Sequence, residues 1–212
     1  GATGRANGIA FGPDGRLYGC ASGDRCIYAW EPGTWQKTKI AEGTQSNDLV
    51  VLRNGTVFYT DPSARLVWRL AAHTFARTEA ARLEWGPNGI AVSRDQATLL
   101  VAEFSADTIH GFPLDGDSRV AGPAQAAYRL AVPSDGRGHL DGMVVLADGR
   151  LLIGTSLGTQ LAPPVQSGAA PARHLVIPSP QGRPRCNYAR VSPDGAWLYT
   201  AYAADLLRRR LR

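Results

Sequence analysis

The sequence predicts an all-β protein with the architecture of a β-propeller, with about five blades present in the chain. Three observations support this fold: a pattern that is repeated five times, a tight-turn signal at the same point of each repeat, and short β-rich segments around that turn. The repeats begin at Asn7, Asn47, Asn88, Asp141 and Asn187, so successive starts are 40, 41, 53 and 46 residues apart. A period of about 40 to 50 residues is typical of propeller blades.

The first segment of each repeat starts with Asn or Asp and continues with small or aliphatic residues, such as GIAF after Asn7. Because the innermost strand of a blade lies close to the propeller axis, these segments are expected to be inner strands. Seven residues after each start the turn contains another Asn or Asp: Asp14, Asn54, Asp95, Asp148 and Asp194. Asn and Asp before Gly suit two-residue hairpins, so these five side chains are expected to serve the turns only.

The remaining strands follow the turns. The segments LYGC, VFYT, LLVA, LLIG and LYTA are short and β-rich, which predicts the second strand of each blade. Third strands are predicted at 26–30, 66–70 and 109–114, and the segment 71–84 is predicted to be a strand plus a loop. The Pro-, Ala- and Gly-rich segment 161–173 is expected to be a loop inside the fourth repeat. Residues 1–212 are expected to form a single propeller domain.

Composition excludes several classes of protein. The 212 residues are 44% hydrophobic and 19% charged, as in globular proteins, and no apolar run approaches the length of a transmembrane helix. The net charge of +5 comes from Arg residues spread along the chain, without a nucleic-acid-binding motif. We therefore expect a soluble protein that binds neither nucleic acid nor membrane, in the cytoplasm, the periplasm or outside the cell.

The three cysteines, Cys20, Cys26 and Cys186, fit no zinc-binding spacing. Free thiols are expected, with a bridge between Cys20 and Cys26 as the alternative.

The residues that begin the repeats suggest a ligand site. Inner strands run along the propeller axis, so equivalent starts lie at the same mouth of the central channel. Five side chains with amide or carboxylate oxygens would meet there, and Ca²⁺ binds such oxygens. Asn and Asp also cap strands through local hydrogen bonds, which is the alternative reading. Because all five share one offset from the turn, we favour a ligand or metal site, in which Asp141 is the carboxylate.

The order of these motifs makes the chain resemble the gluconolactonase family, which includes regucalcin and diisopropylfluorophosphatase. The motifs that carry the resemblance are residues 7–18, Ser46-Asn47-Asp48, Phe58-Tyr59-Thr60-Asp61-Pro62, Pro87-Asn88-Gly89, Asp141-Gly142-Met143 and Pro193-Asp194-Gly195. The resemblance implies a six-bladed propeller that binds one divalent metal, usually Ca²⁺, with Zn²⁺, Mn²⁺ or Mg²⁺ as alternatives. The family's ligands are a Glu, two Asn and an Asp. The last three correspond to Asn47, Asn88 and Asp141. The Glu belongs to a Glu-Gly-Pro motif that this sequence lacks, so one further blade is expected upstream of Gly1.

The resemblance further implies a metal-dependent hydrolase of small, sugar-type lactones. A metal-bound lactone carbonyl is electrophilic, and Asp141 could act as a general base on water or attack directly; the resemblance implies the proton-transfer role. Asn7, Gln45, His139 and Asn187 are the candidate substrate-binding residues, and His139 is also a candidate second base. Gln45 stands where some sugar lactonases carry an Arg. The alternatives are a non-catalytic binding propeller and an esterase or organophosphate hydrolase with the same metal site. The expected partner is a small lactone or ester, bound by a monomer or weak oligomer.

Overall fold

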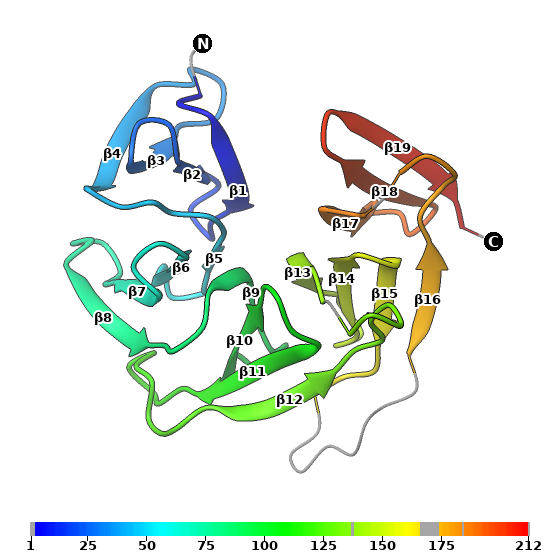
Figure 1. Ribbon diagram of the computed structural model, residues 1–212. Helices are drawn as coiled ribbons and strands as arrows, with labels where there is room; N and C mark the ends of the chain where they lie inside the picture. The colour runs from blue at the N-terminus through cyan, green and yellow to red at the C-terminus, as the bar shows by residue number, and fades with distance from the viewer. Residues whose placement is uncertain (1–2, 137, 166–173, 184, 212) are drawn as a thin grey trace.

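The structure, a computed structural model, describes residues 3–136, 138–165, 174–183 and 185–211. These residues form five antiparallel sheets in which strand order follows the sequence. The sheets lie around a common axis as an open arc, with the first sheet at one end and the last at the other (Figure 1). The predicted all-β propeller with five blades is therefore confirmed.

The first two blades have four strands each. Blade 1 contains β1 (Ala6–Phe11), β2 (Leu17–Ala21), β3 (Cys26–Trp30) and β4 (Lys37–Glu42), and blade 2 contains β5 (Leu49–Val51), β6 (Val57–Asp61), β7 (Leu66–Leu70) and β8 (Arg77–Arg82). The predicted third strands at 26–30 and 66–70 coincide with β3 and β7. The segment 71–84 contains a loop followed by β8, as predicted.

The other three blades continue the pattern. Blade 3 contains β9 (Pro87–Val92), β10 (Thr98–Glu103), β11 (Thr108–Pro113) and β12 (Gln125–Arg129), blade 4 contains β13 (Leu140–Val145), β14 (Leu151–Thr155), β15 (Gly158–Ala162) and β16 (Leu175–Pro178), and blade 5 contains β17 (Tyr188–Val191), β18 (Trp197–Tyr202) and β19 (Asp205–Arg210). The strand predicted at 109–114 is displaced by one residue from β11. The loop predicted at 161–173 begins later, because Leu161 and Ala162 belong to β15. Its residues 166–173 lie outside the described part of the chain.

The turn residues have the role that the sequence predicts. In each inner hairpin the side-chain oxygen of the turn Asp or Asn accepts a hydrogen bond from the backbone N–H two residues later. The pairs are Asp14–Arg16, Asn54–Thr56, Asp95–Ala97, Asp148–Arg150 and Asp194–Ala196, at 3.0 to 3.1 Å. These local bonds fix the hairpins at the end of the channel opposite to the repeat starts.

The hydrophobic core lies between neighbouring blades. Tyr18, Cys20 and Ile27 of blade 1, for example, pack against Leu49 and Tyr59 of blade 2, and similar clusters join the other neighbouring blades. The three cysteines are buried and free, so the expectation of free thiols is confirmed and the Cys20–Cys26 bridge is wrong. No helix among the described residues is long and apolar enough to cross a bilayer.

Blade 1 has one apolar face that no described blade covers. Ile9 and Phe11 of β1 are 53% and 68% exposed. The equivalent residues of blade 2 are Leu49, which is 3% exposed, and Val51, which packs in the cluster between blades 1 and 2. The upstream blade expected from the sequence would cover this face, and it remains a prediction.

Candidate metal and substrate site

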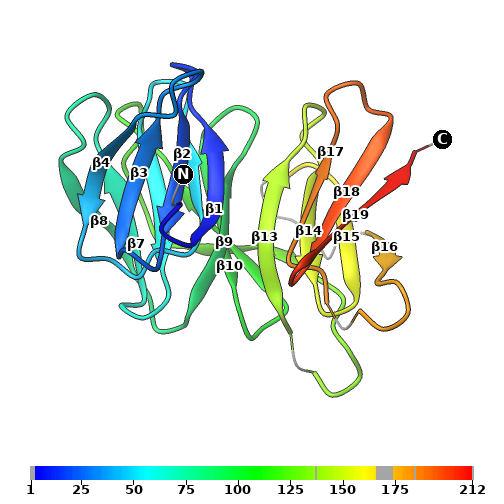
Figure 2. The ribbon, with the colours of Figure 1, turned by 90° about the horizontal axis from the view of Figure 1, so that it is seen from above.

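The inner strands bring the repeat starts together at one mouth of the channel, around a cavity of about 820 Å³. Seen from above, β1, β9 and β13 run in similar directions, which places their starts at comparable heights (Figure 2). Six of the seven candidate residues line this cavity: Asn7, Asn47, Asn88, His139, Asp141 and Asn187.

Gln45 is the exception. Its side chain is exposed and it is not among the described residues that line the cavity. Its backbone N–H donates a hydrogen bond to Asp61 Oδ2 at 3.0 Å, which ties this segment to the end of β6. The structure therefore gives no support to the predicted substrate contact by Gln45.

Glycine in the position after the repeat start allows the inner strands to approach closely. A Cβ at Gly89 would lie 2.1 Å from the carbonyl oxygen of Asp141, and one at Gly8 would lie 2.2 Å from Asp48 Oδ1. The N–H of Gly142 donates to the carbonyl oxygen of Asn187 at 2.8 Å, which links blades 4 and 5. These short contacts hold the polar side chains at the mouth in fixed relative positions.

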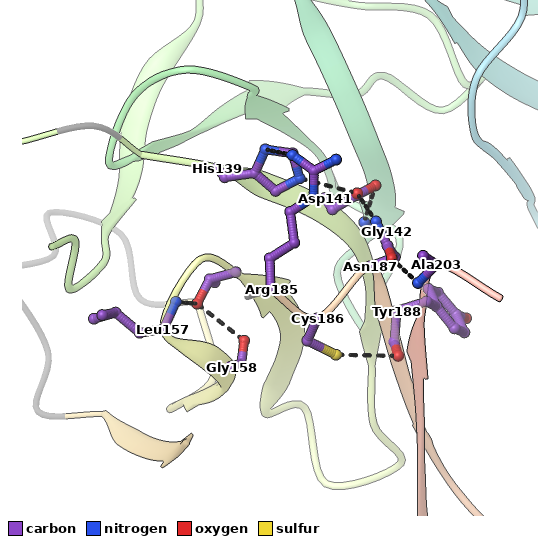
Figure 3. A network of polar contacts seen from close by, with 11 residues as sticks. His139, Asp141, Gly142, Leu157, Gly158, Arg185, Cys186, Asn187, Tyr188 and Ala203 are labelled. Carbon is purple, nitrogen blue, oxygen red and sulfur yellow. Dashed lines mark hydrogen bonds and ion pairs between the residues drawn. The ribbon is translucent and has the colours of Figure 1, made fainter. Parts of the chain in front are cut away.

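Asp141 is held by two donors. The N–H of Gly142 donates to its Oδ1 at 3.0 Å, and Asn187 Nδ2 donates to its Oδ2 at 2.9 Å (Figure 3). The Oδ1 of Asn187 in turn accepts a hydrogen bond from the N–H of Ala203 at 2.7 Å. Asn187 therefore positions Asp141. Its NH2 group has a second hydrogen and lines the cavity, so the substrate contact expected from the sequence stays a prediction.

His139 lies between Asp141 and a cation. Its Nε2 is 3.3 Å from Asp141 Oδ2, and its Nδ1 is 3.4 Å from Arg185 Nη1. Phe104 contacts the imidazole edge-on, with 4.4 Å between ring centroids. Because a guanidinium only donates, the contact with Arg185 directs the Nδ1 lone pair of His139 toward the cation. Nε2 lies beside Asp141 but makes no hydrogen bond with the described residues, so Gly142 and Asn187 are the residues that hold the carboxylate.

The buried side-chain oxygen of Asn88 is a candidate metal ligand. Its side chain is 5% exposed, and its Oδ1 has no hydrogen-bond partner among the described residues. A buried carbonyl oxygen without a partner costs roughly 1 to 3 kcal/mol. Together with the half-buried Asn47 and the carboxylate of Asp141, it forms a set of hard oxygen donors of the kind that Ca²⁺ binds.

Carboxylates, thiols and imidazoles alone do not form a metal site in the described part of the chain. No group of three or more His, Cys, Asp or Glu residues there could hold an ion. A cation at the channel mouth would therefore depend on the amide oxygens of Asn47 and Asn88. The residues present fit a hard cation and do not fit a thiolate or imidazole site.

Asp48 also lines the cavity, and the sequence reasoning missed it. Its Oδ1 accepts a hydrogen bond from the N–H of Leu49 at 2.9 Å, and its Oδ2 accepts one from Ile90 at 3.2 Å. Burial raises the pKa of Asp48 to about 7, against the effect of these two donors, and the nearby charge of Asp141 acts in the same direction as burial. The sequence did contain a signal for it: Asp48 directly follows a repeat start, a position where three other repeats have Gly.

Asp48→Asn is expected to remove the loss of stability that the chelator-treated wild type undergoes as pH rises. The pKa of Asp48 lies above its ordinary value in the folded state, so the stability of the wild type falls as pH rises from about 4 to 7. Asn removes this ionisation, at about 1.4 kcal/mol per pKa unit. Relative to the wild type, the melting temperature of Asp48→Asn should rise by several degrees from pH 4 to pH 8. At pH 4 the variant should be the less stable protein, because an amide offers an acceptor oxygen to only one of the two backbone N–H donors, Leu49 and Ile90.

Thermal melting across this pH range checks the expectation. Asp194→Asn is the control, because Ser192 and Ala196 hold the pKa of this exposed turn carboxyl below its usual value. The melting temperature of Asp194→Asn should not rise relative to that of the wild type at high pH. A difference between Asp48→Asn and wild type that stays constant from pH 4 to 8 would contradict the assignment.

Comparison with known proteins places the chain in a family. The family model described as SMP-30/Gluconolactonase/LRE-like region matches residues 2–168. A gluconolactonase of Zymomonas mobilis subsp. mobilis is 30% identical over 118 residues, which cover 46% of this chain and 33% of that protein. The match thus spans about a third of the length of this curated relative.

Solved structures show the same fold. XC5397 from Xanthomonas campestris, described as a gluconolactonase, superposes with a TM-score of 0.81 and 23% identity over 100% of this chain and 73% of its own. A putative gluconolactonase gives a TM-score of 0.78 at 19% identity, covering 97% of this chain and 74% of its own. A streptogramin B lyase gives 0.70 at 14% identity, covering 97% and 70%. At these identities the likeness shows the fold alone. Because the family model extends over most of the sequence, the chain belongs to the SMP-30/gluconolactonase/LRE-like family.

Proposed function

We propose that this protein is a divalent-metal-dependent hydrolase of small, sugar-type lactones and that Asp141 is its general base. The observation that carries the proposal is the arrangement at the channel mouth. There, Asn187 and Gly142 hold the Asp141 carboxylate in a cavity that also contains the unpartnered carbonyl oxygen of Asn88. Membership of the family supports a lactonase-type reaction.

The residues that would hold the metal are Asn47, Asn88 and Asp141, whose hard oxygens favour Ca²⁺ over softer ions. Mg²⁺, Mn²⁺ and Zn²⁺ are the alternatives. When bound, such an ion polarises a lactone carbonyl and stabilises the charge that develops on its oxygen.

The chain's own residues account for the proton transfer. Asp141 accepts a proton from a water molecule as the water oxygen bonds to the lactone carbonyl carbon. The bond between that carbon and the ring oxygen then breaks, and the ring oxygen takes up a proton, so a hydroxy acid leaves the site. Asn187 and Gly142 keep the carboxylate in one orientation, and the His139 ring lies beside it. Asn7 lies exposed at the rim, where its amide can bind substrate hydroxyls.

The test is proton release from glucono-δ-lactone at constant pH, with Ca²⁺ and with a chelator, after subtraction of the spontaneous rate. The proposal expects turnover that depends on added metal. Parallel assays with a simple aryl ester and an organophosphate separate the lactonase from the alternative hydrolases. Absence of turnover on every lactone and ester by metal-loaded protein would contradict the proposal and favour a binding propeller.

A further inference from the structure

Arg185 is a cation at the cavity without an anionic partner among the described residues. It is the single Lys or Arg of the described cavity lining. Its described side-chain contact is the 3.4 Å approach of Nη1 to His139 Nδ1, an atom that carries no negative charge, and none of the ion pairs found within the described residues includes it. Arg183, two residues earlier, shows the contrast, since its Nη2 lies 2.7 Å from Asp205 Oδ2.

A guanidinium has five N–H donors in a planar fork that matches carboxylate and phosphate oxygens. One of these donors contacts His139. The remaining donors of Arg185 have no described partner, although the side chain lines the cavity and is exposed. The unused part of the fork is therefore available to an oxyanion of a bound ligand.

The position of Arg185 relative to Asp141 limits which part of a ligand it can reach. The imidazole of His139 lies between them, with contacts of 3.4 Å on one side and 3.3 Å on the other (Figure 3). The reacting carbonyl must lie next to Asp141, so Arg185 reaches a substituent several bonds away. An anion near Asp141 and Asp48 would meet two carboxyl groups, whereas an anion at Arg185 would meet a cation.

We propose that Arg185 selects lactones that carry an oxyanion, a carboxylate or a phosphate ester, at the end remote from the reacting carbonyl. This inference rests on the proposed lactone hydrolysis and adds the substrate class. The net charge of +5 agrees with it, because a positive protein attracts anionic ligands at long range. Arg185 is thus a specificity residue, while Asp141 performs the proton transfer.

Binding tests the inference without turnover. Titration calorimetry would compare gluconate, glucarate and 6-phosphogluconate, which share the C1 carboxylate and the polyol chain and differ only in the group at C6. The wild type should bind glucarate and 6-phosphogluconate more tightly than gluconate, and Arg185→Gln should lose about 10- to 100-fold of that preference, as expected for hydrogen bonds to a charged group. The ranking of glucarate and 6-phosphogluconate separates a carboxylate from a phosphate ligand.

Two further variants sharpen the test. Arg185→Lys keeps the charge without the planar fork and should retain part of the preference. Arg94→Gln makes the same change in net charge in the β9–β10 hairpin, at the opposite end of the channel, and should retain all of it. Equal preference for a C6 anion in the wild type and Arg185→Gln would overturn the inference, as would equal binding of all three ligands by the wild type.

The kinetic readout is the ratio of kcat/KM for glucarolactone or 6-phosphogluconolactone to that for neutral glucono-δ-lactone. This ratio should fall in Arg185→Gln and stay at its wild-type value in Arg94→Gln. Turnover of these lactones with an unchanged ratio in Arg185→Gln would overturn the specificity role alone. Loss of the preference for a C6 anion in Arg185→Gln, in a protein that hydrolyses no lactone, would support the role of Arg185 while contradicting the proposed reaction.

Discussion

Replacement of Asp141 by Asn is expected to lower the rate of lactone hydrolysis by about 10²- to 10⁴-fold, the usual contribution of a positioned general base. The amide retains an oxygen for the Gly142 N–H, but it cannot accept a proton from water. His139→Ala should lose much less, because the Nδ1 lone pair faces Arg185 and the Asp141 carboxylate is held by Gly142 and Asn187.

Steady-state kinetics on glucono-δ-lactone, with saturating Ca²⁺, measure both variants. Melting temperatures show whether each variant is folded. Equal losses in Asp141→Asn and His139→Ala would assign the base to His139. A fully active Asp141→Asn would remove Asp141 from the reaction altogether.

Replacement of Asn88 by Ala is expected to leave the stability of the metal-free protein unchanged or higher and to abolish the stability gained from Ca²⁺. The variant removes a buried carbonyl oxygen that has no hydrogen-bond partner among the described residues. Such an atom costs roughly 1 to 3 kcal/mol, which offsets the packing lost with the side chain, so stability in chelator should change little or rise. The gain of stability from Ca²⁺ should disappear, whereas a ligand at 100 times its Kd adds about 2.7 kcal/mol to the wild type.

Thermal melting with chelator and with Ca²⁺ gives both quantities. Asn54→Ala is the matched control, because the Asn54 side chain is hydrogen-bonded to Thr56 and Ser118 at the opposite end of the channel. This control should lose stability in both conditions and keep the full Ca²⁺ gain. An Asn88→Ala protein that still gains stability from Ca²⁺ as the wild type does would place the cation elsewhere.

The blades were predictable because a local signal fixes each of them. A turn Asp or Asn at constant spacing from the repeat start defines the hairpin, and the hairpin defines the register of the two inner strands. Equal offsets then place equivalent residues at one end of the channel. All five repeat starts accordingly line one cavity, together with His139, which stands two residues before Asp141.

The remaining site residues have no such local signal. Arg185 precedes its repeat start, and its approach to His139 joins two segments that lie 46 residues apart in the sequence. At Asp48 the sequence shows only a carboxylate where three of the other four repeats have Gly, and the burial that raises its pKa arises in the assembled fold. Gln45 was placed by family analogy, and the hydrogen bond of its backbone to Asp61 leaves its side chain exposed. Contacts between loops and side-chain burial follow from the assembled arc rather than from one repeat.

The most direct test of the central claim is the location of a bound cation at the channel mouth. Crystals grown with Mn²⁺ or a lanthanide in place of Ca²⁺ would show the ion by anomalous scattering. The account predicts one strong peak about 2.0 to 2.6 Å from the side-chain oxygens of Asn47, Asn88 and Asp141. A peak at another site, or a site at the mouth that stays empty at millimolar ion, would contradict it.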